Sequence, residues 1–220
     1  MIKKVLIAED QESANISIQK TLEILGVEEV DYVYYCDDAL IKITNAKKAG
    51  KSYDLLICDL YFEPDGKPQK ISGGAKLIPA VREVQPELKV LIFSAENKPA
   101  VIDSLFKNQF IDGYVRKARN DAKELQIAFE KISHNQQHYP KHLADLIKNQ
   151  HSYDFTDLDI TIISLLAQGV PQKNIPDILL ENQIKCSLSN VEKRLKKMKE
   201  VFEYTKNEQL ILFCKDMGII

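Results

Sequence analysis

The sequence predicts an α/β domain built on a parallel sheet, followed by a smaller all-α domain. Short apolar runs alternate with amphipathic stretches from residue 1 to about residue 135. After Phe155 no strand pattern occurs, and helical patterns separated by turn signals follow instead. The chain has 220 residues, of which 45% are hydrophobic and 28% charged, so it is long enough for two ordinary globular domains, each with its own core.

Five apolar runs predict the strands, at residues 5–8, 31–35, 55–58, 90–93 and 114–115. Apolar residues at three-and-four spacing predict helices near residues 12–25, 38–49, 75–84, 98–109 and 121–133. Alternating strands and helices form a parallel sheet with both faces covered. If the strands are ordered 2-1-3-4-5, strands one and three are neighbours, and ligands are expected at their carboxyl ends.

The second part of the chain is predicted to be helical throughout. Its four helical segments span residues 156–169, 171–180, 187–202 and 207–218. The stretch before it is polar, with one short helical pattern, and is typical of a linker. We therefore expect three regions: residues 1–133, a linker over residues 134–154, and residues 155–220.

Composition excludes several classes of protein. The formal net charge is −2, so a nucleic-acid site must be a local basic patch. No apolar run approaches the ~20 residues that span a bilayer, and the apolar stretch near Met1 is too short for a signal peptide. The four cysteines are scattered singly, which is typical of reduced thiols. We expect a cytoplasmic protein with no membrane association.

Acidic side chains follow two of the predicted strands. Glu9 and Asp10 come directly after the first strand, and Asp59 follows the buried run "LLIC". Three carboxylates at one edge would repel one another, and an oxygen-only cluster of this kind suits Mg²⁺. Ser94 and Lys117 end the fourth and fifth strands, where they could contact a phosphoryl group. The pattern predicts a metal-assisted phosphoryl site, although a lone Asp10 could equally be a helix cap.

This constellation, with Tyr114 three residues before Lys117, resembles the receiver domain of two-component response regulators over residues 3–133. The resemblance implies a (βα)5 flavodoxin-like fold in which Asp59 is the phosphoacceptor for a sensor histidine kinase or phosphotransfer protein. It implies Mg²⁺ held by Glu9, Asp10, Asp59 and the backbone carbonyl of Tyr61. Ser94 and Lys117 would contact the phosphoryl oxygens. Tyr114 would be an aromatic switch that turns inward and changes the face formed by the fourth helix, fifth strand and fifth helix.

The sequence departs from this resemblance in two places. The segment after Asp59, "LYFEPDGKPQKISGGAKL", is longer than the usual receiver loop and most resembles a branch that includes capsule-synthesis regulators. Ala118 follows Lys117 where most receivers have proline. A rival reading, a haloacid-dehalogenase-type phosphatase, needs a second Asp two residues after the nucleophile. Tyr61 occupies that position, which disfavours the rival.

The stretch "SLSNVEKRLKKMKEVF" predicts an amphipathic helix with a basic outer side. Its core-facing stripe consists of Val191, Leu195, Met198 and Phe202, whereas the other faces carry Lys193, Arg194, Lys196, Lys197 and Lys199. A solvated lysine face is one interpretation. The preceding short helix and turn favour another, helix-turn-helix geometry, in which the second helix enters the major groove of DNA.

Residues 155–217 resemble the DNA-binding domain of LuxR/NarL-type regulators, through "FTDLDITIISLLAQGVPQKNI" and "SNVEKRLKKMKEVF". The resemblance implies that Asn190, Lys193, Arg194 and Lys197 face double-stranded DNA. Arg194, with its bidentate fork, would read guanine, and Lys196 and Lys199 would meet phosphates. Three features depart from the family: the longer turn "ENQIKC", Pro176 within the second helix, and Glu203 in place of a glycine.

The sequence thus predicts a LuxR/NarL-type response regulator that is phosphorylated on Asp59 and binds DNA as a homodimer. We expect no enzymatic activity beyond Mg²⁺-dependent self-phosphorylation and hydrolysis of the acyl phosphate. Two alternatives stay open: a phosphorylation-controlled module whose helical tail binds a protein, and a regulator that works without phosphorylation.

Overall fold

A five-stranded parallel sheet forms the centre of the first part of the chain in the computed structural model, which describes residues 2–140 and 153–220. The strands lie in the order β2-β1-β3-β4-β5, which confirms the predicted order. Their bounds are β1 (Lys4–Ala8), β2 (Glu29–Val33), β3 (Leu55–Cys58), β4 (Lys89–Ser94) and β5 (Gly113–Arg116). All four residues of β3 are fully buried, as expected for a central strand covered on both faces.

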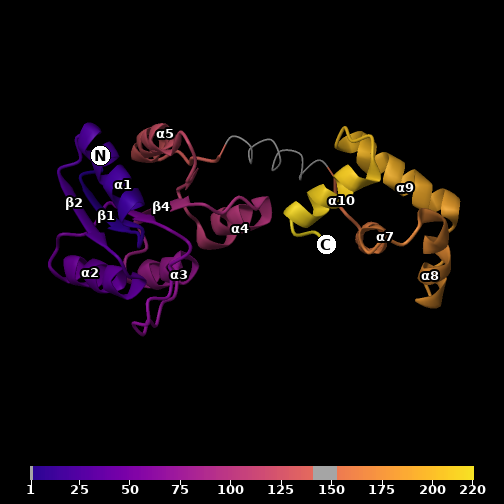
Figure 1. Cartoon of the computed structure of the whole chain (residues 1–220), viewed down its shortest axis with the longest axis horizontal. Coiled ribbons are helices and arrows are strands. Elements are labelled where there is room, and N and C mark those ends of the chain that lie inside the picture. The colour runs from indigo at the N-terminus through magenta and orange to yellow at the C-terminus, as the bar shows by residue number, and fades with distance from the viewer. Residues whose placement is uncertain (1, 141–152) are drawn as a thin grey trace. The chain divides into compact units, whose positions relative to one another are not determined.

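Helices follow the strands in alternation and cover both faces of the sheet (Figure 1). They are α1 (Glu12–Ile24), α2 (Cys36–Lys48), α3 (Gly74–Val84), α4 (Pro99–Gln109) and α5 (Asp121–Ser133). α1 and α5 share one core cluster with alternate strand residues such as Ile7 and Ile57. Leu6 and Leu56, one residue away in each strand, are also fully buried, because α2 and α3 cover the opposite face.

The predicted second strand, residues 31–35, was placed two residues too late. β2 spans Glu29–Val33, because Lys4 to Ala8 pair with Glu29 to Val33 in register. Tyr34 and Tyr35, which are apolar enough to suggest a strand, lie beyond this ladder, and Tyr35 is the N-cap of α2. An edge strand with polar Glu29 and Asp31 gives a weak apolar signal, so the aromatic pair shifted the prediction.

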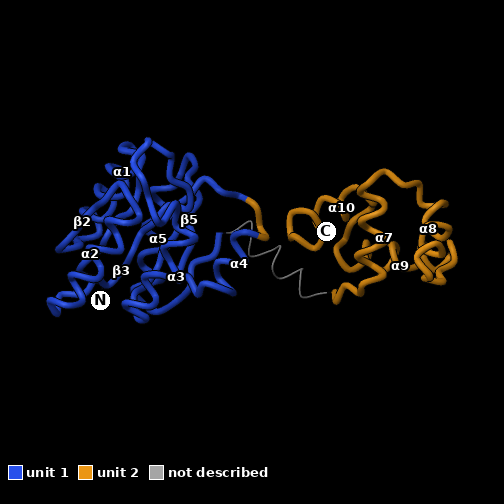
Figure 2. Tube along the Cα trace, turned by 90° about the horizontal axis from the view of Figure 1, so that it is seen from below, with its two compact units in different colours: residues 1–97, 101–141 blue, residues 98–100, 142–220 orange. Residues whose placement is uncertain are grey.

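The chain divides into two compact units, residues 1–97 with 101–141 and residues 98–100 with 142–220 (Figure 2). The described part of the second unit is helical, as predicted. It contains α7 (Asp157–Ala167), the short 3-10 helix η1 (Gln172–Asn174), α8 (Ile175–Glu181), α9 (Leu188–Val201) and α10 (Asn207–Asp216). Its core contains the predicted stripe of Val191, Leu195, Met198 and Phe202. No described helix is both long and apolar enough to cross a bilayer.

Local signals explain where these helices begin and end. Thr156 and Asp159 form a capping box at the start of α7, and Ser187 caps α9 by accepting the Asn190 N–H. Pro176 lies in the first turn of α8, where its missing N–H leaves no helical bond unmade. Glu203 adopts a left-handed backbone with φ of 56° after α9, the conformation for which a glycine is usual at that place.

The predicted linker, residues 134–154, falls partly outside the described residues, since residues 141–152 are not described. Residues 134–140 contain no helix, and they pack against the first unit. The short helical pattern predicted within the linker lies mainly in the undescribed segment.

Gly74 lets α3 approach the end of β3. A Cβ added to Gly74 would overlap the carbonyl oxygen of Asp59 and lie 3.0 Å from the Cys58 Sγ. We predict that Gly74→Ala lowers the free energy of unfolding by about 1–3 kcal/mol, as expected when a close-packed site is overfilled. Ala75→Ser, at the next and exposed position of α3, should cost no more than about 0.5 kcal/mol. Urea unfolding of both variants would test this, and equal effects would contradict the packing argument.

Candidate functional site

Three carboxylates converge where β1 and β3 end. Ala8 pairs with Cys58, so Glu9 and Asp10 follow one strand at the same edge at which Asp59 follows its neighbour. One oxygen from each of the three carboxylates lies within 4.8 Å of the others. Glu9 and Asp59 are buried, with 1% and 4% of their surface exposed. The structure therefore brings together the acidic residues that the sequence predicts as one site.

Lys117 forms ion pairs with two of these carboxylates. Its Nζ lies 2.6 Å from Asp59 Oδ2 and 2.8 Å from Glu9 Oε2, reaching them from just beyond β5. Burial alone would lower the pKa of Lys117, but its hydrogen bonds to Asp59 and Glu9 outweigh burial and raise it. Lys117 is thus a fixed cation at the mouth of the sheet.

Burial raises the pKa of Glu9 to about 7, and the hydrogen bond and positive charge of Lys117 oppose this rise only in part. Lys117 therefore does not fully stabilise the ionised form of Glu9. A second positive group would lower the remaining electrostatic cost.

The donor set fits a small divalent cation. Asp10 Oδ2 accepts the Glu63 N–H at 2.7 Å, while Asp10 Oδ1 is buried without a hydrogen-bond partner among the described residues. Asp59 Oδ1 accepts the Leu60 N–H at 2.6 Å. Carboxylate oxygens on adjacent strand ends are the ligands that hard cations prefer. Glu9, Asp10 and Asp59 can accordingly hold a metal ion.

Ser94 and Tyr114 lie buried beside this cluster, on the next two strands. Ser94 ends β4, and its side chain is fully buried. The Tyr114 ring is also fully buried, and its hydroxyl donates to the Glu96 carbonyl oxygen at 2.8 Å. Burial raises the pKa of Tyr114 well above its usual value, so the phenol is neutral. The ring of the residue predicted to be the switch is thus buried.

Glu96 is a site residue that the sequence analysis missed. Its backbone carbonyl oxygen accepts the Tyr114 hydroxyl, and its carboxylate accepts the Tyr61 hydroxyl at 2.6 Å. This hydrogen bond raises the pKa of Tyr61 to about 12. Tyr61 and Glu96 thus connect the segment after β3 with the segment after β4. Tyr61 lies two residues beyond Asp59, and Glu96 lies two residues beyond Ser94. This spacing is the only sequence signal for the Tyr61–Glu96 pair.

The long loop after Asp59 is held in place by acidic side chains from neighbouring elements. Asp37, in the first turn of α2, accepts the Lys70 and Ile71 N–H groups at 2.9 Å each. Asp65, within the loop, accepts the Tyr35 hydroxyl at 2.5 Å. Lys67 Nζ lies 3.8 Å from the centroid of the Tyr35 ring, within cation–π distance.

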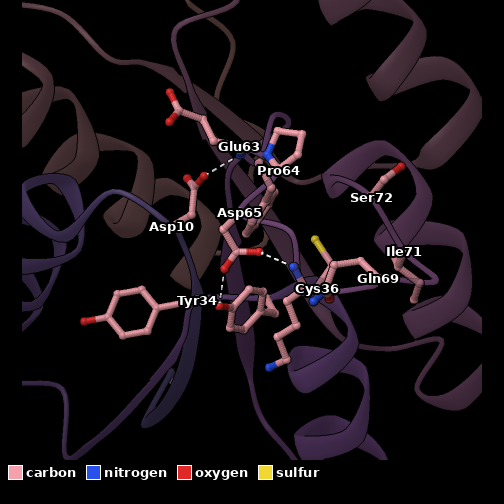
Figure 3. A pocket seen from close by; sticks show the side chains of 12 residues that line it. Asp10, Tyr34, Cys36, Glu63, Pro64, Asp65, Gln69, Ile71 and Ser72 are labelled. Carbon is pink, nitrogen blue, oxygen red and sulfur yellow. Dashed lines mark hydrogen bonds between the residues drawn. The ribbon is translucent and has the colours of Figure 1, made fainter.

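Between this loop and the start of α2 lies a pocket of about 480 Å³ (Figure 3). Its lining includes Asp10, Glu63, Asp65 and Cys36, and Figure 3 shows the Asp10 carboxylate directed at the Glu63 backbone. Asp10 therefore belongs both to the acidic cluster and to the wall of the pocket. The length of the loop, noted in the sequence as a departure, creates this space.

The second unit presents the predicted basic helix, α9, with its lysines in different settings. Lys193, Lys196 and Lys197 are exposed, and Lys199 is partly exposed. Lys197 Nζ lies 5.8 Å from the centroid of the Tyr153 ring, and Lys196 is 3.7 Å from Glu200 within the helix. Asn190, in the first turn of α9, is exposed. A positive surface of this kind can meet a polyanion.

Arg194 has a different environment from the one expected of a guanine reader. Its Nη1 lies 2.8 Å from Asp159 Oδ1, and the Asp159 side chain is fully buried at the start of α7. Burial alone would raise the pKa of Asp159, but the hydrogen bonds from Thr156 and Arg194 hold it below its usual value. This geometry favours a structural role for Arg194, which ties α9 to α7, over the predicted reading of guanine.

Comparison with solved structures identifies the fold. The chain resembles the RcsB response regulator of Salmonella typhimurium, with a TM-score of 0.64 and 20% identity over 96% of this chain and 98% of that one. It resembles the isolated receiver (REC) domain of RcsB from Salmonella enterica serovar Typhimurium, with phosphomimetic BeF3−, at a TM-score of 0.53 and 23% identity over 66% and 97% of the two chains.

A third similar structure contains two RcsB dimers bound to two parallel DNAs, with a TM-score of 0.57 and 21% identity over 98% of this chain and 99% of that one. No protein-family profile and no curated protein sequence matches the chain. At these identities the comparisons establish the fold, a flavodoxin-like α/β domain with an added helical domain. This confirms the fold predicted from the sequence.

The Arg194–Asp159 pair yields a prediction. Arg194→Ala would leave the buried Asp159 carboxylate hydrogen-bonded to Thr156 but without its cation, and should lower the free energy of unfolding of the second unit by about 2–3 kcal/mol. Lys193→Ala, at an exposed neighbouring position, should change it by less than about 0.5 kcal/mol. Because the folded-state pKa of Asp159 is lowered, its stabilisation is present above the ordinary carboxyl pKa and is lost as the pH falls below about 4. Unfolding curves at pH 7 and pH 3 would show this, and equal loss at both would contradict it.

Proposed function

We propose that this chain is a response regulator whose first unit accepts a phosphoryl group on Asp59. The observation that carries the proposal is the contact of Lys117 with both Asp59 and Glu9 at the carboxyl edge of a flavodoxin-like sheet. A carboxylate held beside a fixed cation, with further oxygen ligands adjacent, matches the demands of phosphoryl transfer, which are alignment and charge neutralisation. The phosphodonor is a phosphohistidine on a sensor kinase or a phosphotransfer protein.

Mg²⁺ would be held by Glu9, Asp10, Asp59 and the carbonyl of Tyr61, and it would neutralise phosphoryl oxygens. An Asp59 carboxylate oxygen attacks phosphorus, so that a P–O bond forms while the P–N bond to the donor histidine breaks. Lys117 remains close enough to neutralise the transferred group, and the Ser94 hydroxyl donates to one of its oxygens. Apart from this self-phosphorylation and the later hydrolysis of the acyl phosphate, we propose no catalysis.

We further propose that the second unit binds double-stranded DNA and that the chain acts as a homodimer. In this assignment residues 1–133 are the receiver, 134–154 the linker and 155–220 the helix-turn-helix domain. Support comes from the exposed lysines of α9 and from the fold shared with RcsB, which has been solved as dimers on DNA. Lys193, Lys196, Lys197 and Lys199 would contact phosphates, and Asn190 would face a base edge.

A second candidate is a phosphorylation-controlled module whose helical unit binds an acidic protein surface. The observation that favours it is the engagement of Arg194 Nη1 with Asp159, since lysines are then the exposed cations of α9. Lysine point charges suit a polyanion of either kind, whereas guanine reading is mostly the task of arginine.

The phosphoacceptor assignment predicts Mg²⁺-dependent labelling. Incubation with a small phosphodonor and Mg²⁺ should add one phosphoryl group to the wild type, and Asp59→Asn should carry none, as measured by intact mass. Asp54→Asn, which alters an aspartate at the opposite end of β3, is the matched control and should be labelled like the wild type. Equal labelling of Asp59→Asn and the wild type would refute the assignment.

The DNA assignment predicts a salt-dependent affinity. Because each phosphate contact releases counterions, Lys193→Ala and Lys196→Ala should each reduce the slope of log K against log salt by about 1. Lys215→Ala, in the last turn of α10, should leave the slope unchanged. Fluorescence anisotropy with a random-sequence duplex at several salt concentrations measures these slopes. Weak binding whose salt dependence is unchanged by all three substitutions would instead support the protein-binding candidate.

A further inference from the structure

The chain does not leave the first unit at the end of α5. Asn135 adopts a left-handed backbone with φ of 58°, and the Gln136 N–H then bonds to the Lys131 carbonyl oxygen at 2.9 Å. This helix-ending turn redirects the chain along the outer edge of β5. We refer to residues 136–140 as the strap.

The strap pairs with β5 in the manner of a short parallel strand. His138 bridges Gly113, donating its N–H to the Asp112 carbonyl oxygen and accepting the Tyr114 N–H at its own, each at 3.0 Å. Gln137 adds a side-chain bond to the Ile111 carbonyl oxygen at 3.3 Å. An edge strand otherwise leaves such backbone groups unpaired, so the strap closes this edge of the sheet.

Side chains fasten the strap to both neighbouring helices. The His138 side chain is buried, and its Nε2 lies 3.6 Å from Glu124 Oε2 on α5. The Tyr139 ring stacks on Phe106 of α4, with centroids 3.8 Å apart and an interplanar angle of 23°. Three elements, α4, β5 and α5, are therefore joined by five consecutive residues, more than a passive linker requires.

Tyr114 is joined to the strap through its backbone, because its N–H donates to the His138 carbonyl oxygen. Its neighbour in β5, Val115, belongs to the core shared with α1 and α5. Because side chains alternate along a strand, the Tyr114 ring lies on the opposite face of the sheet from Val115. The Tyr114 ring is fully buried there, while its N–H is held by the strap.

We propose that the strap stabilises Tyr114 in its buried position. Tyr139 is the residue that positions the strap. The His138 carbonyl oxygen holds the Tyr114 N–H, and the next residue, Tyr139, is anchored by its stack on Phe106, so release of the Tyr139 ring would loosen the backbone that carries the Tyr114 ring. A regulatory role for the strap rests on the proposed function, in which Tyr114 is the switch. Docking of the strap and phosphorylation of Asp59 then favour each other, because coupling between two sites is reciprocal.

Nitration of tyrosines in the full-length chain by tetranitromethane, mapped by mass spectrometry, tests whether the strap keeps Tyr114 buried. Tyr32, with 45% of its surface exposed, serves as the internal reference. Tyr139→Ala should increase the nitration of Tyr114 relative to Tyr32 by about fivefold or more. Tyr139→Phe keeps the ring and should behave like the wild type. His138→Pro, which removes the N–H bonded to Asp112, should act in the same direction as Tyr139→Ala.

Two results would overturn the proposal. One is that Tyr114 stays as protected from nitration as in the wild type, in variants whose backbone amides near residue 138 have lost their protection from hydrogen exchange. The other is equal binding of beryllofluoride, in Mg²⁺, by Tyr139→Ala and the wild type, since reciprocity requires weaker binding by the variant. If the wild type itself fails to bind beryllofluoride, the phosphoacceptor assignment fails, while the nitration comparison still decides whether the strap holds Tyr114.

Discussion

A single lysine bridging two buried carboxylates is the interaction on which the first unit depends. Lys117 reaches Asp59 and Glu9 at hydrogen-bond distance, although the three residues follow three different strands. Such a contact requires β1, β3 and β5 to be aligned at their carboxyl ends, which the parallel register provides. The sheet therefore serves as a rigid frame that holds opposite charges in place at its edge.

The balance of charge at this edge is incomplete. Lys117 supplies one positive charge against the carboxylates of Glu9, Asp10 and Asp59, and burial keeps the pKa of Glu9 raised to about 7 in spite of Lys117. Natural proteins retain such uncompensated groups mainly at functional sites, where their electrostatic cost is part of the mechanism. The same deficit explains why a divalent cation and a phosphoryl group fit the site together: the cation offsets the carboxylates, and Lys117 offsets the incoming oxygens.

Much of this arrangement could be predicted from the sequence, because strand ends and helix periodicity are local signals. The runs around Ile7 and Ile57 determine the central strands, and the acids that follow them must then be neighbours in a 2-1-3-4-5 sheet. β2 was misplaced because its polar edge position hides the apolar pattern. The pairing of Arg194 with Asp159 was missed because it joins residues 35 apart in sequence, and a basic residue on an amphipathic helix gives no sign of its partner.

The strap was missed for a related reason. "NQQHYP" is polar and ends in proline, which is typical of a linker, and only the burial of His138 and the stacking of Tyr139 on Phe106 in the folded chain show otherwise. Propensity describes what a segment prefers in isolation, whereas pairing with β5 is decided by the free edge of a sheet formed elsewhere in the chain. Glu96 similarly acquires its role only through the approach of Tyr61 and Tyr114.

The most direct test of the central claim is a calorimetric titration of the full-length chain with Mg²⁺. If Glu9, Asp10 and Asp59 form one oxygen-ligand cluster beside Lys117, the wild type shows a single saturable site, and Asp10→Asn or Glu9→Gln weakens it strongly. No saturable binding, or binding that is indifferent to both substitutions, would contradict the account.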